Sequence, residues 1–300
     1  RDLSHQSHDT TTTGYMKAGA TGPPPRTVHR RGVPMLASDS SPVRGALDIA
    51  ALRSSGVPFS TAATDRAAAS RDLWPRGTLE LRAGRALPQP AAVAWPRTAD
   101  EVRSLLDLAS ATATPVVTYG AGSGVCGAAA GMSDALVLDT KRMKRVLHLD
   151  EDLGLVHVQP GILGQHLEDW LEARGWRTAH SPSSIMCSTL GGWAAARSAG
   201  QFSSRYGVFA DMVVAAAMET PSGRILGGTW CPADQPDPLP LMLGSEGGMG
   251  VITELLVRVV RPPETRWLRG YAFPTLEAAW QAMRELMQAD LWPSVLRLYD

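Results

Sequence analysis

Five loops rich in glycine, serine and threonine are the part of this sequence best suited to binding chemistry. Glycine lets the backbone reach positive φ angles and approach a ligand closely, and consecutive amides can form a nest that binds an anion. The first loop directly follows an expected strand, where its amides could hold a pyrophosphate. Tight turns alone would explain one such loop, but five of them favour a binding role. The loops are residues 120–124, 181–184, 188–193, 197–200 and 244–250.

The run Gly122-Ser-Gly124-Val-Cys-Gly127 also matches the GxGxxG fingerprint of nicotinamide-dinucleotide sites. That fingerprint requires a helix that opens at the third glycine and a crossover of about a dozen residues before the next parallel strand. Only residues 128–134 separate this loop from the next expected strand, and they include Gly131 and Asp134. We therefore reject the nicotinamide interpretation.

The elements that must position these loops alternate between helices and strands. Thr98-Ala-Asp-Glu101 is a capping box, in which hydroxyl and carboxylate satisfy each other's free amides at the start of a helix. Gly175 is expected to end an amphipathic helix over 161–174 as a left-handed cap. Pro221-Ser-Gly223 marks the turn of a hairpin. Strands are expected at 115–119, 135–139, 146–149, 155–158, 212–219, 224–226 and 251–260.

The pattern changes after Pro262-Pro263. Trp267–Phe273 and Val295–Tyr299 are expected strands, and Thr275–Ala289 is an expected helix between them. Together they would form one βαβ unit, which cannot bury both faces of its sheet. We therefore expect a second domain that begins here and is incomplete in these residues.

Composition excludes several classes of protein. The 29 basic and 29 acidic side chains cancel, which argues against a partner nucleic acid. Cys126, Cys187 and Cys231 are far apart and form neither a disulfide framework nor a metal knuckle. We therefore expect no metal and a reducing, cytoplasmic compartment. The longest wholly apolar run, 212–218, is far shorter than the about 18 residues of a transmembrane segment, and none is expected.

Residues 88–265 resemble the flavin-binding domain of the vanillyl-alcohol oxidase / p-cresol methylhydroxylase (PCMH) family. The resemblance rests on Val116-Val-Thr-Tyr-Gly-Ala-Gly-Ser-Gly-Val125, on Gly191-Gly192 with Arg205-Tyr-Gly207, and on Gly244-Ser-Glu-Gly-Gly-Met-Gly-Val-Ile-Thr253. Within this family, Gly175-Trp-Arg-Thr-Ala-His-Ser-Pro-Ser-Ser184 is similar to the characteristic run of the alkyldihydroxyacetonephosphate synthases.

The resemblance implies an α+β fold, namely a PCMH-type FAD-binding domain of two α+β subdomains followed by the start of a truncated cap domain. We expect a disordered or poorly ordered N-terminal segment over 1–56 and the FAD-binding domain over 57–265. The beginning of an incomplete substrate or cap domain is expected over 266–300.

The resemblance also implies how the loops share the cofactor. Residues 118–124 would wrap the FAD pyrophosphate, residues 183–189 and 195–198 would line the flavin and ribityl chain, and residues 246–252 would hold the adenosine side. FAD is expected to be non-covalent, with Cys126 a buried small side chain and not an attachment point. The expected FAD-binding residues are Thr118, Tyr119, Gly120, Ala121, Gly122, Ser123, Gly124, Ser183, Ser184, Ser188, Thr189, Gly192, Ala195, Ala196, Arg197, Ser198, Glu246, Gly247, Gly248, Gly250, Val251 and Ile252.

Several single side chains admit two interpretations. Arg297 matches an arginine that faces flavin and substrate in the family and is our catalytic candidate, although it could be a solvent-facing strand residue. His180 could contact the flavin, but we favour a hydrogen-bonded loop histidine. Arg197 could pair with a flavin phosphate or with Glu246, and both remain open. Trp193 is expected to pack in the core.

The resemblance implies a flavoenzyme that exchanges the acyl group of acyl-dihydroxyacetone phosphate for a fatty alcohol in ether-lipid synthesis. Its substrate would be a small or lipid-like molecule, and a homodimer is conceivable. The catalytic Tyr and His cluster of that subfamily would fall after residue 300, so a fragment is expected. The alternatives are an FAD-dependent D-2-hydroxyacid (lactate or glycolate) dehydrogenase or oxidase, and an inactive FAD-binding fragment.

Overall fold

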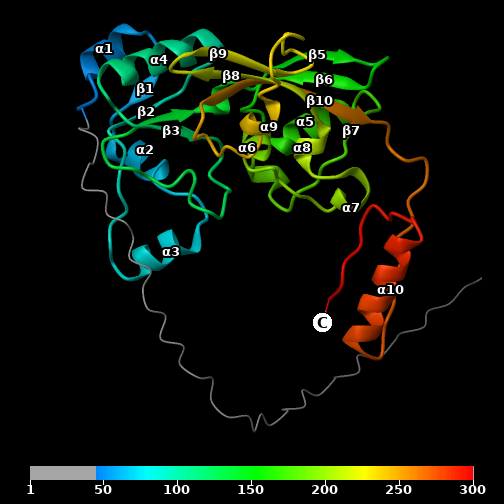
Figure 1. Cartoon of the computed structure of the whole chain (residues 1–300). Coiled ribbons are helices and arrows are strands. Elements are labelled where there is room, and N and C mark those ends of the chain that lie inside the picture. Colours follow the sequence, from blue (N-terminus) through cyan, green and yellow to red (C-terminus); the bar gives the residue numbers. More distant parts are fainter. Residues whose placement is uncertain (1–44, 300) are drawn as a thin grey trace, which may run out of the picture. The chain divides into compact units, whose positions relative to one another are not determined.

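The computed structural model describes residues 45–299, so residues 1–44 of the N-terminal segment expected over 1–56 lie outside the described residues. Two sheets follow one another along the chain (Figure 1). The first contains, in spatial order, β1 (Phe59–Ser60), β2 (Ala92–Ala94), β4 (Leu136–Asp139) and β3 (Val116–Tyr119). Strands β2, β4 and β3 are parallel, whereas β1 runs antiparallel to β2.

Strands β2 and β4 of the first sheet are buried on both faces, which explains why they consist largely of Ala, Val and Leu. On one face, Leu136 and Leu138 pack with the apolar sides of helices α1 and α4. On the other face, Val137 belongs to a separate cluster. The helices of this part are α1 (Ile49–Ser54), α2 (Ala63–Ala68), α3 (Pro75–Arg82) and α4 (Ala99–Ala111).

The second sheet is antiparallel and contains, in spatial order, β5 (Val146–Asp150), β6 (Leu155–Val158), β10 (Val251–Val260), β8 (Val213–Thr220) and β9 (Gly223–Gly228). The two-residue strand β7 (Arg177–Thr178) pairs with the end of β10. The large cluster of buried side chains on this sheet includes Leu167, Trp193 and Phe209 from its helices. Those helices are α5 (Gly164–Glu172), α6 (Leu190–Ala195), α7 (Ser203–Tyr206), α8 (Phe209–Met212) and α9 (Leu239–Met242), with the 3-10 turns η1 (Thr140–Arg142) and η2 (Ile185–Cys187).

The two sheets are tied together by contacts between distant parts of the chain. The Arg103 guanidinium on α4 donates to the Thr220 carbonyl at the end of β8, over 2.9 Å. Val251, the first residue of β10, packs in the cluster of α1 and α4. These contacts confirm the expected α+β fold of two joined subdomains.

The sequence signals for helix ends and turns are confirmed, except that the second hydrogen bond of the expected capping box is formed with a different backbone amide. The Thr98 hydroxyl accepts the Glu101 amide at 3.1 Å, but the Glu101 carboxylate accepts the Arg97 amide at 2.6 Å instead of that of Thr98. Gly175 has φ +72° directly after α5, as expected of a left-handed cap. Strands β8 and β9 form the expected hairpin.

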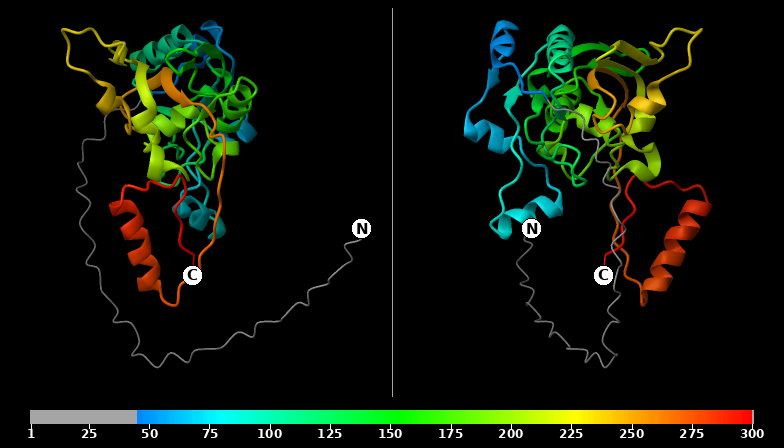
Figure 2. Two further views of the ribbon diagram at one scale, coloured as in Figure 1. Left: turned by 90° about the vertical axis from the view of Figure 1, so that its right-hand side faces the viewer. Right: turned by 60° about the vertical axis from the view of Figure 1, so that its left-hand side comes forward.

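Two expectations about the ends of the domain are wrong. Residues 49–54, expected to be poorly ordered, form α1, because Leu52 is fully buried against the first sheet. Residues 267–273 and 295–299, expected to be strands, pair with nothing in the described chain and flank a single helix, α10 (Leu276–Gln288; red in Figure 2). Two isolated strands and one helix bury too little surface to hold a sheet together.

The helices of residues 45–299 are short. The longest, α4 and α10, have 13 residues each. Within this part of the chain, no helix has both the length and the apolar character that crossing a membrane requires.

Candidate functional site

A cavity of about 340 Å³ lies where the small-residue loops meet. The loop after β3 contributes one wall (the first wall, residues 118–129), residues 184–198 the second, and residues 245–252 the third. Most lining residues are glycine, alanine or serine, which leaves backbone amides within reach of a ligand. The first wall leaves the carboxyl end of a parallel strand, the edge at which open α/β sheets bind ligands. The volume of the cavity falls within the range of small-molecule sites.

Glycine is required at the tip of the first wall. Gly122 has φ +69°, and a Cβ there would collide with the Tyr119 hydroxyl. At Gly120 an added Cβ would collide with the Thr189 hydroxyl of the second wall. The backbone therefore approaches both neighbours too closely for any side chain, and its peptide groups form the cavity surface.

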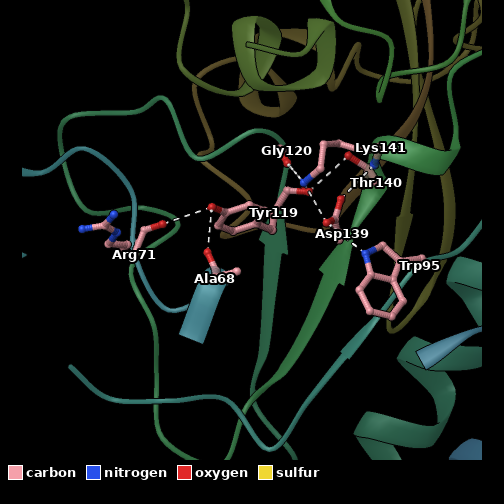
Figure 3. A network of polar contacts seen from close by, with 8 residues as sticks. All are labelled: Ala68, Arg71, Trp95, Tyr119, Gly120, Asp139, Thr140 and Lys141. Carbon is pink, nitrogen blue, oxygen red and sulfur yellow. Dashed lines mark hydrogen bonds and ion pairs between the residues drawn. The ribbon is translucent and has the colours of Figure 1, made fainter. Parts of the chain in front are cut away.

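A buried carboxylate holds the start of this loop (Figure 3). Asp139, at the end of β4, accepts from the Trp95 indole over 3.1 Å and from the Lys141 ammonium over 2.7 Å. The same ammonium donates to the Gly120 carbonyl over 2.9 Å and lies 4.9 Å from the centre of the Tyr119 ring. Because β3 and β4 are parallel neighbours, this network fixes the loop to the sheet.

Tyr119 and Asp72 fasten the outer side of the loop. Burial, and secondarily the carboxylates of Asp139 and Asp72, raise the pKa of the Tyr119 hydroxyl, so this group stays protonated. It donates to the Arg71 carbonyl at 3.1 Å (Figure 3). The Asp72 carboxylate accepts the Gly127 amide at 2.9 Å and is itself buried.

The second wall is built on a tryptophan. Trp193 is buried, and its indole donates to the Ser188 hydroxyl over 2.7 Å, which in turn donates to the Ser184 carbonyl over 2.7 Å. Thr189 caps α6 by accepting the Gly192 amide at 3.3 Å. Trp193 thus packs in the core as expected, and its edge also reaches the cavity.

His180 lies behind the second wall and is 1% exposed. One ring nitrogen, Nε2, is 3.2 Å from the Ser198 hydroxyl, and Ser198 lines the cavity. The ring packs against Trp193 and Phe209. Burial lowers the pKa of His180 from 6.5 to about 4, so the imidazole is neutral at physiological pH. The favoured interpretation, a hydrogen-bonded loop histidine, agrees with these contacts.

The third wall carries a hydroxyl that has no partner among the described residues. Its backbone is pinned to α6 because the Gly244 amide donates to Ala194 and the Glu246 amide to Ala195, each over 3.0 Å. Between them, the Ser245 hydroxyl is buried, lines the cavity and makes no hydrogen bond within residues 45–299. Such a buried hydroxyl calls for a ligand that offers a hydrogen bond.

These features fit FAD. The backbone amides of the first wall suit a pyrophosphate. Gly120 and Gly122 place no side chain in the cavity. The Ser245 hydroxyl has no partner among residues 45–299 and can bond a polar group of the cofactor. The apolar parts of the lining, such as Ile252 and Ala195, suit flat aromatic rings.

Most expected FAD-binding residues line this single cavity, although whether each contacts FAD stays a prediction. The cavity-lining residues among them are Thr118, Gly120, Ala121, Gly122, Ser123, Gly124, Ser184, Ser188, Thr189, Gly192, Ala195, Ala196, Ser198, Glu246, Gly247, Gly250 and Ile252. Five expected residues do not line it, namely Tyr119, Ser183, Arg197, Gly248 and Val251. Val251 packs in the core, and Tyr119 supports the loop from outside the cavity.

The two arginine candidates lie elsewhere. Arg197 donates to the carbonyls of Leu243, at 2.9 Å, and Pro240, at 2.8 Å, and forms no ion pair with Glu246 among the described residues. Whether it pairs with a flavin phosphate stays a prediction. Arg297 is exposed, lies outside the cavity lining, and belongs to a segment in which the expected strand is not formed. Its catalytic role stays a prediction.

The expectation for Cys126 is wrong. The side chain is exposed and lines the cavity, whereas a buried small side chain was expected. The Gly127 amide next to it donates to the Asp72 carboxylate, and Val125 and Cys126 are both exposed. Cys126 is thus accessible to a ligand of the cavity.

Sequence reasoning missed the residues that support the loops from a distance. Asp72 and Lys141 stand far from the glycine motifs in sequence, and only tertiary contacts bring them there. Ser245 could have been found, because it lies inside the fifth loop. The remaining lining residues that were not among the expected FAD-binding residues are Val125, Cys126, Ala128, Ala129, Thr140, Pro160, Gly191 and Trp193.

Comparison with known proteins identifies the cofactor. Residues 90–228 match the family model described as an FAD binding domain. The alkyldihydroxyacetonephosphate synthase of Trypanosoma brucei brucei is 33% identical over 241 residues, which cover 77% of this chain and 38% of that protein. A glycolate oxidase subunit of Bacillus subtilis is 32% identical over 214 residues, which cover 70% of this chain and 46% of that protein. The chain therefore spans less than half the length of these relatives.

Solved structures with a similar fold lead to the same group of proteins. A crystal structure of alkyldihydroxyacetonephosphate synthase superposes with a TM-score of 0.70 and 28% identity, covering 79% of this chain and 44% of that one. The 6-hydroxy-D-nicotine oxidase of Arthrobacter nicotinovorans, with 18% identity and a TM-score of 0.57, shares the fold.

The fold, the cavity and these matches define a flavoprotein with FAD as its cofactor. The FAD-binding domain of this chain is similar to that of the alkyldihydroxyacetonephosphate synthases, which is consistent with the PCMH-type family.

Proposed function

We propose that this chain is the FAD-binding part of an enzyme that exchanges the acyl group of an acyl-dihydroxyacetone phosphate for a fatty alcohol. The ester releases its fatty acid, and the alcohol oxygen bonds to the dihydroxyacetone carbon, with no net transfer of electrons. The observation that carries this proposal is the similarity to the synthase of Trypanosoma brucei brucei, at 33% identity over 77% of this chain.

The residues of this chain would bind and orient the cofactor. Amides of the first wall would hold the pyrophosphate, while the serine hydroxyls and the Trp193 edge of the second wall would line the flavin side. Bound FAD would supply the reactive ring over which a lipid-like substrate is held. Non-covalent binding is part of the proposal, and Cys126, which is exposed at the cavity, is the side chain on which it must be tested.

A second candidate function is oxidation of a small 2-hydroxy acid. It is supported by 32% identity to the glycolate oxidase subunit of Bacillus subtilis and 30% identity to a D-lactate dehydrogenase of Arabidopsis thaliana. In that reaction the substrate loses a hydride and the cofactor gains it, so the two proposals differ in electron balance.

Anaerobic incubation of the FAD-loaded whole enzyme, of which this chain is the proposed FAD-binding part, separates these proposals. Glycolate or D-lactate should leave the visible flavin band unchanged, whereas labelled hexadecanol should enter an alkyl product when acyl-dihydroxyacetone phosphate is supplied. Bleaching of the flavin by a hydroxy acid would overturn the synthase proposal in favour of the second candidate. FAD binding with neither reaction would favour an inactive FAD-binding chain.

A homodimer also remains a proposal. Light scattering of the FAD-loaded chain should report twice the mass of the 300-residue chain. A monomeric mass would reject it.

A further inference from the structure

His180 is a buried titratable group that the binding of FAD, as described above, does not explain. It lies two residues after β7, is 1% exposed and packs against aromatic side chains. The ring centres of His180 and Trp193 are 4.7 Å apart in an edge-to-face arrangement, and Phe209 lies 5.3 Å away. A polar ring in such surroundings needs a specific hydrogen bond.

The two ring nitrogens of His180 have different surroundings. Nε2 lies 3.2 Å from the Ser198 hydroxyl, whereas Nδ1 is fully buried and has no hydrogen-bond partner among residues 45–299. The depressed pKa of His180 means that the imidazole carries a single proton at physiological pH. That proton resides on one nitrogen or the other.

The contacts favour the proton on Nε2. A proton on Nδ1 would be a buried N–H donor without an acceptor, which folded proteins tolerate less readily than an unpaired acceptor. A proton on Nε2 instead finds the Ser198 hydroxyl oxygen within hydrogen-bond distance. Ser198 then receives a hydrogen bond and keeps its own proton to donate.

The proton of Ser198 has no good acceptor among residues 45–299. The Ala199 carbonyl is 3.5 Å away, at the limit of a hydrogen bond. Ser198 also lines the cavity, and the phosphate oxygens, carbonyls and ring nitrogens of FAD are mostly acceptors. A hydroxyl that donates into the cavity therefore matches the cofactor better than one that accepts.

We infer that His180 is a positioning residue: it donates from Nε2 to Ser198 and thereby makes the Ser198 hydroxyl a hydrogen-bond donor to FAD. His180 does not touch the cofactor itself. This role concerns cofactor binding, so it holds for either candidate reaction.

Nitrogen NMR of the chain labelled with ¹⁵N-histidine tests the protonation state directly. The chain contains seven histidines, and the His180 signals are assigned by their loss in His180→Phe. The FAD-loaded protein should show a neutral His180 with the proton on Nε2. A proton on Nδ1, or on both nitrogens, would overturn the inference.

A double-mutant cycle tests the link through Ser198. FAD affinity, measured by quenching of flavin fluorescence, should fall about threefold to tenfold in Ser198→Ala, which loses one hydrogen bond. His180→Phe should weaken binding similarly, and the double variant should be no weaker than Ser198→Ala alone. Losses that multiply, or no loss in Ser198→Ala, would show that His180 acts otherwise.

Two controls keep the cycle interpretable. His166→Phe changes an exposed histidine on α5 and should leave FAD affinity unchanged. If His180→Phe does not fold, the FAD affinity of Ser198→Ala still decides the inference. A wild-type FAD affinity in Ser198→Ala would then be sufficient to reject it.

Discussion

The first and second walls of the cavity are held by different kinds of interaction. The loop after β3 is fixed by charged groups. Asp139 and Lys141 join the start of the loop to the sheet, and the Asp72 carboxylate accepts the Gly127 amide at its other end. The second wall is fixed by neutral groups, because Trp193, Phe209 and a neutral His180 pack together behind it. The first wall presents peptide groups to the cavity, and the second presents serine hydroxyls.

This difference suits the two ends of the cofactor. Amides that bind a pyrophosphate need a rigid backbone, which a buried ionic network supplies without occupying the cavity. Hydroxyls that bind a neutral ring system need fixed rotamers, which close packing supplies. Changes on the first wall should therefore act through backbone position, and changes on the second through side-chain orientation.

The largest effect is expected at Gly122. Gly122→Val places a β-branched residue at φ +69° and drives its Cβ into the Tyr119 hydroxyl. FAD affinity should fall by about 1,000-fold or more, which is about 4 kcal/mol. Gly84→Val is the matched control, since Gly84 has φ +72° but no atom near its Cβ position. Equal losses of FAD affinity in both variants would contradict the role of the loop.

Removal of the buried carboxylate should destabilise the first wall next most strongly. Asp139→Ala leaves the Trp95 indole and the Lys141 ammonium without their shared acceptor. The free energy of unfolding should fall by about 3–4 kcal/mol in a urea titration. Asp107→Ala, which removes an exposed partner of Arg103, should change it by less than about 1 kcal/mol. A small effect of Asp139→Ala would mean that the network does not hold the loop.

Acid should weaken the second wall through His180. Between pH 6.5 and about 4, the unfolded chain binds a proton at His180 that the folded chain does not. The free energy of unfolding therefore falls as the pH falls through this window, by up to about 3 kcal/mol. Above pH 6.5 this group contributes no pH dependence. His180→Phe should remove this component of the pH profile, and an unchanged profile would contradict the buried neutral state.

The smallest effect is expected at Lys141. Lys141→Met keeps the length of the side chain but removes its bonds to Gly120 and Asp139. Because this lysine is partly exposed, FAD affinity should fall by about fivefold, or about 1 kcal/mol. Lys144→Met, an exposed lysine outside this network, serves as the control and should bind FAD normally. A larger loss than in Gly122→Val would reverse the order of importance proposed for the first wall.

Local signals predicted most of the framework. The Thr98 cap, the left-handed Gly175 and the turn at 221–223 are each specified by neighbouring residues, and all three lie where the sequence indicates. The strands at 267–273 and 295–299 were misjudged, because alternating apolar residues indicate a strand only where other strands are present to pair with it.

The cavity was predictable where its lining is glycine-rich and local. The residues that hold the loops in place were not predictable, because the contacts of Asp72 and Lys141 and the contact between His180 and Ser198 join residues that only the fold brings together. The contacts of Arg197 were not predictable for the same reason, since the carbonyls it binds lie more than forty residues away in the chain.

The measurement that tests the central claim most directly is a visible absorption spectrum of the chain after incubation with FAD and gel filtration, repeated after acid precipitation. The account predicts a flavin band that travels with the protein, is lost in Gly122→Val, and moves entirely to the supernatant in acid. Flavin that stays in the pellet would contradict non-covalent binding and implicate Cys126. A flavin band that is undiminished in Gly122→Val would contradict the assignment of this cavity to the cofactor.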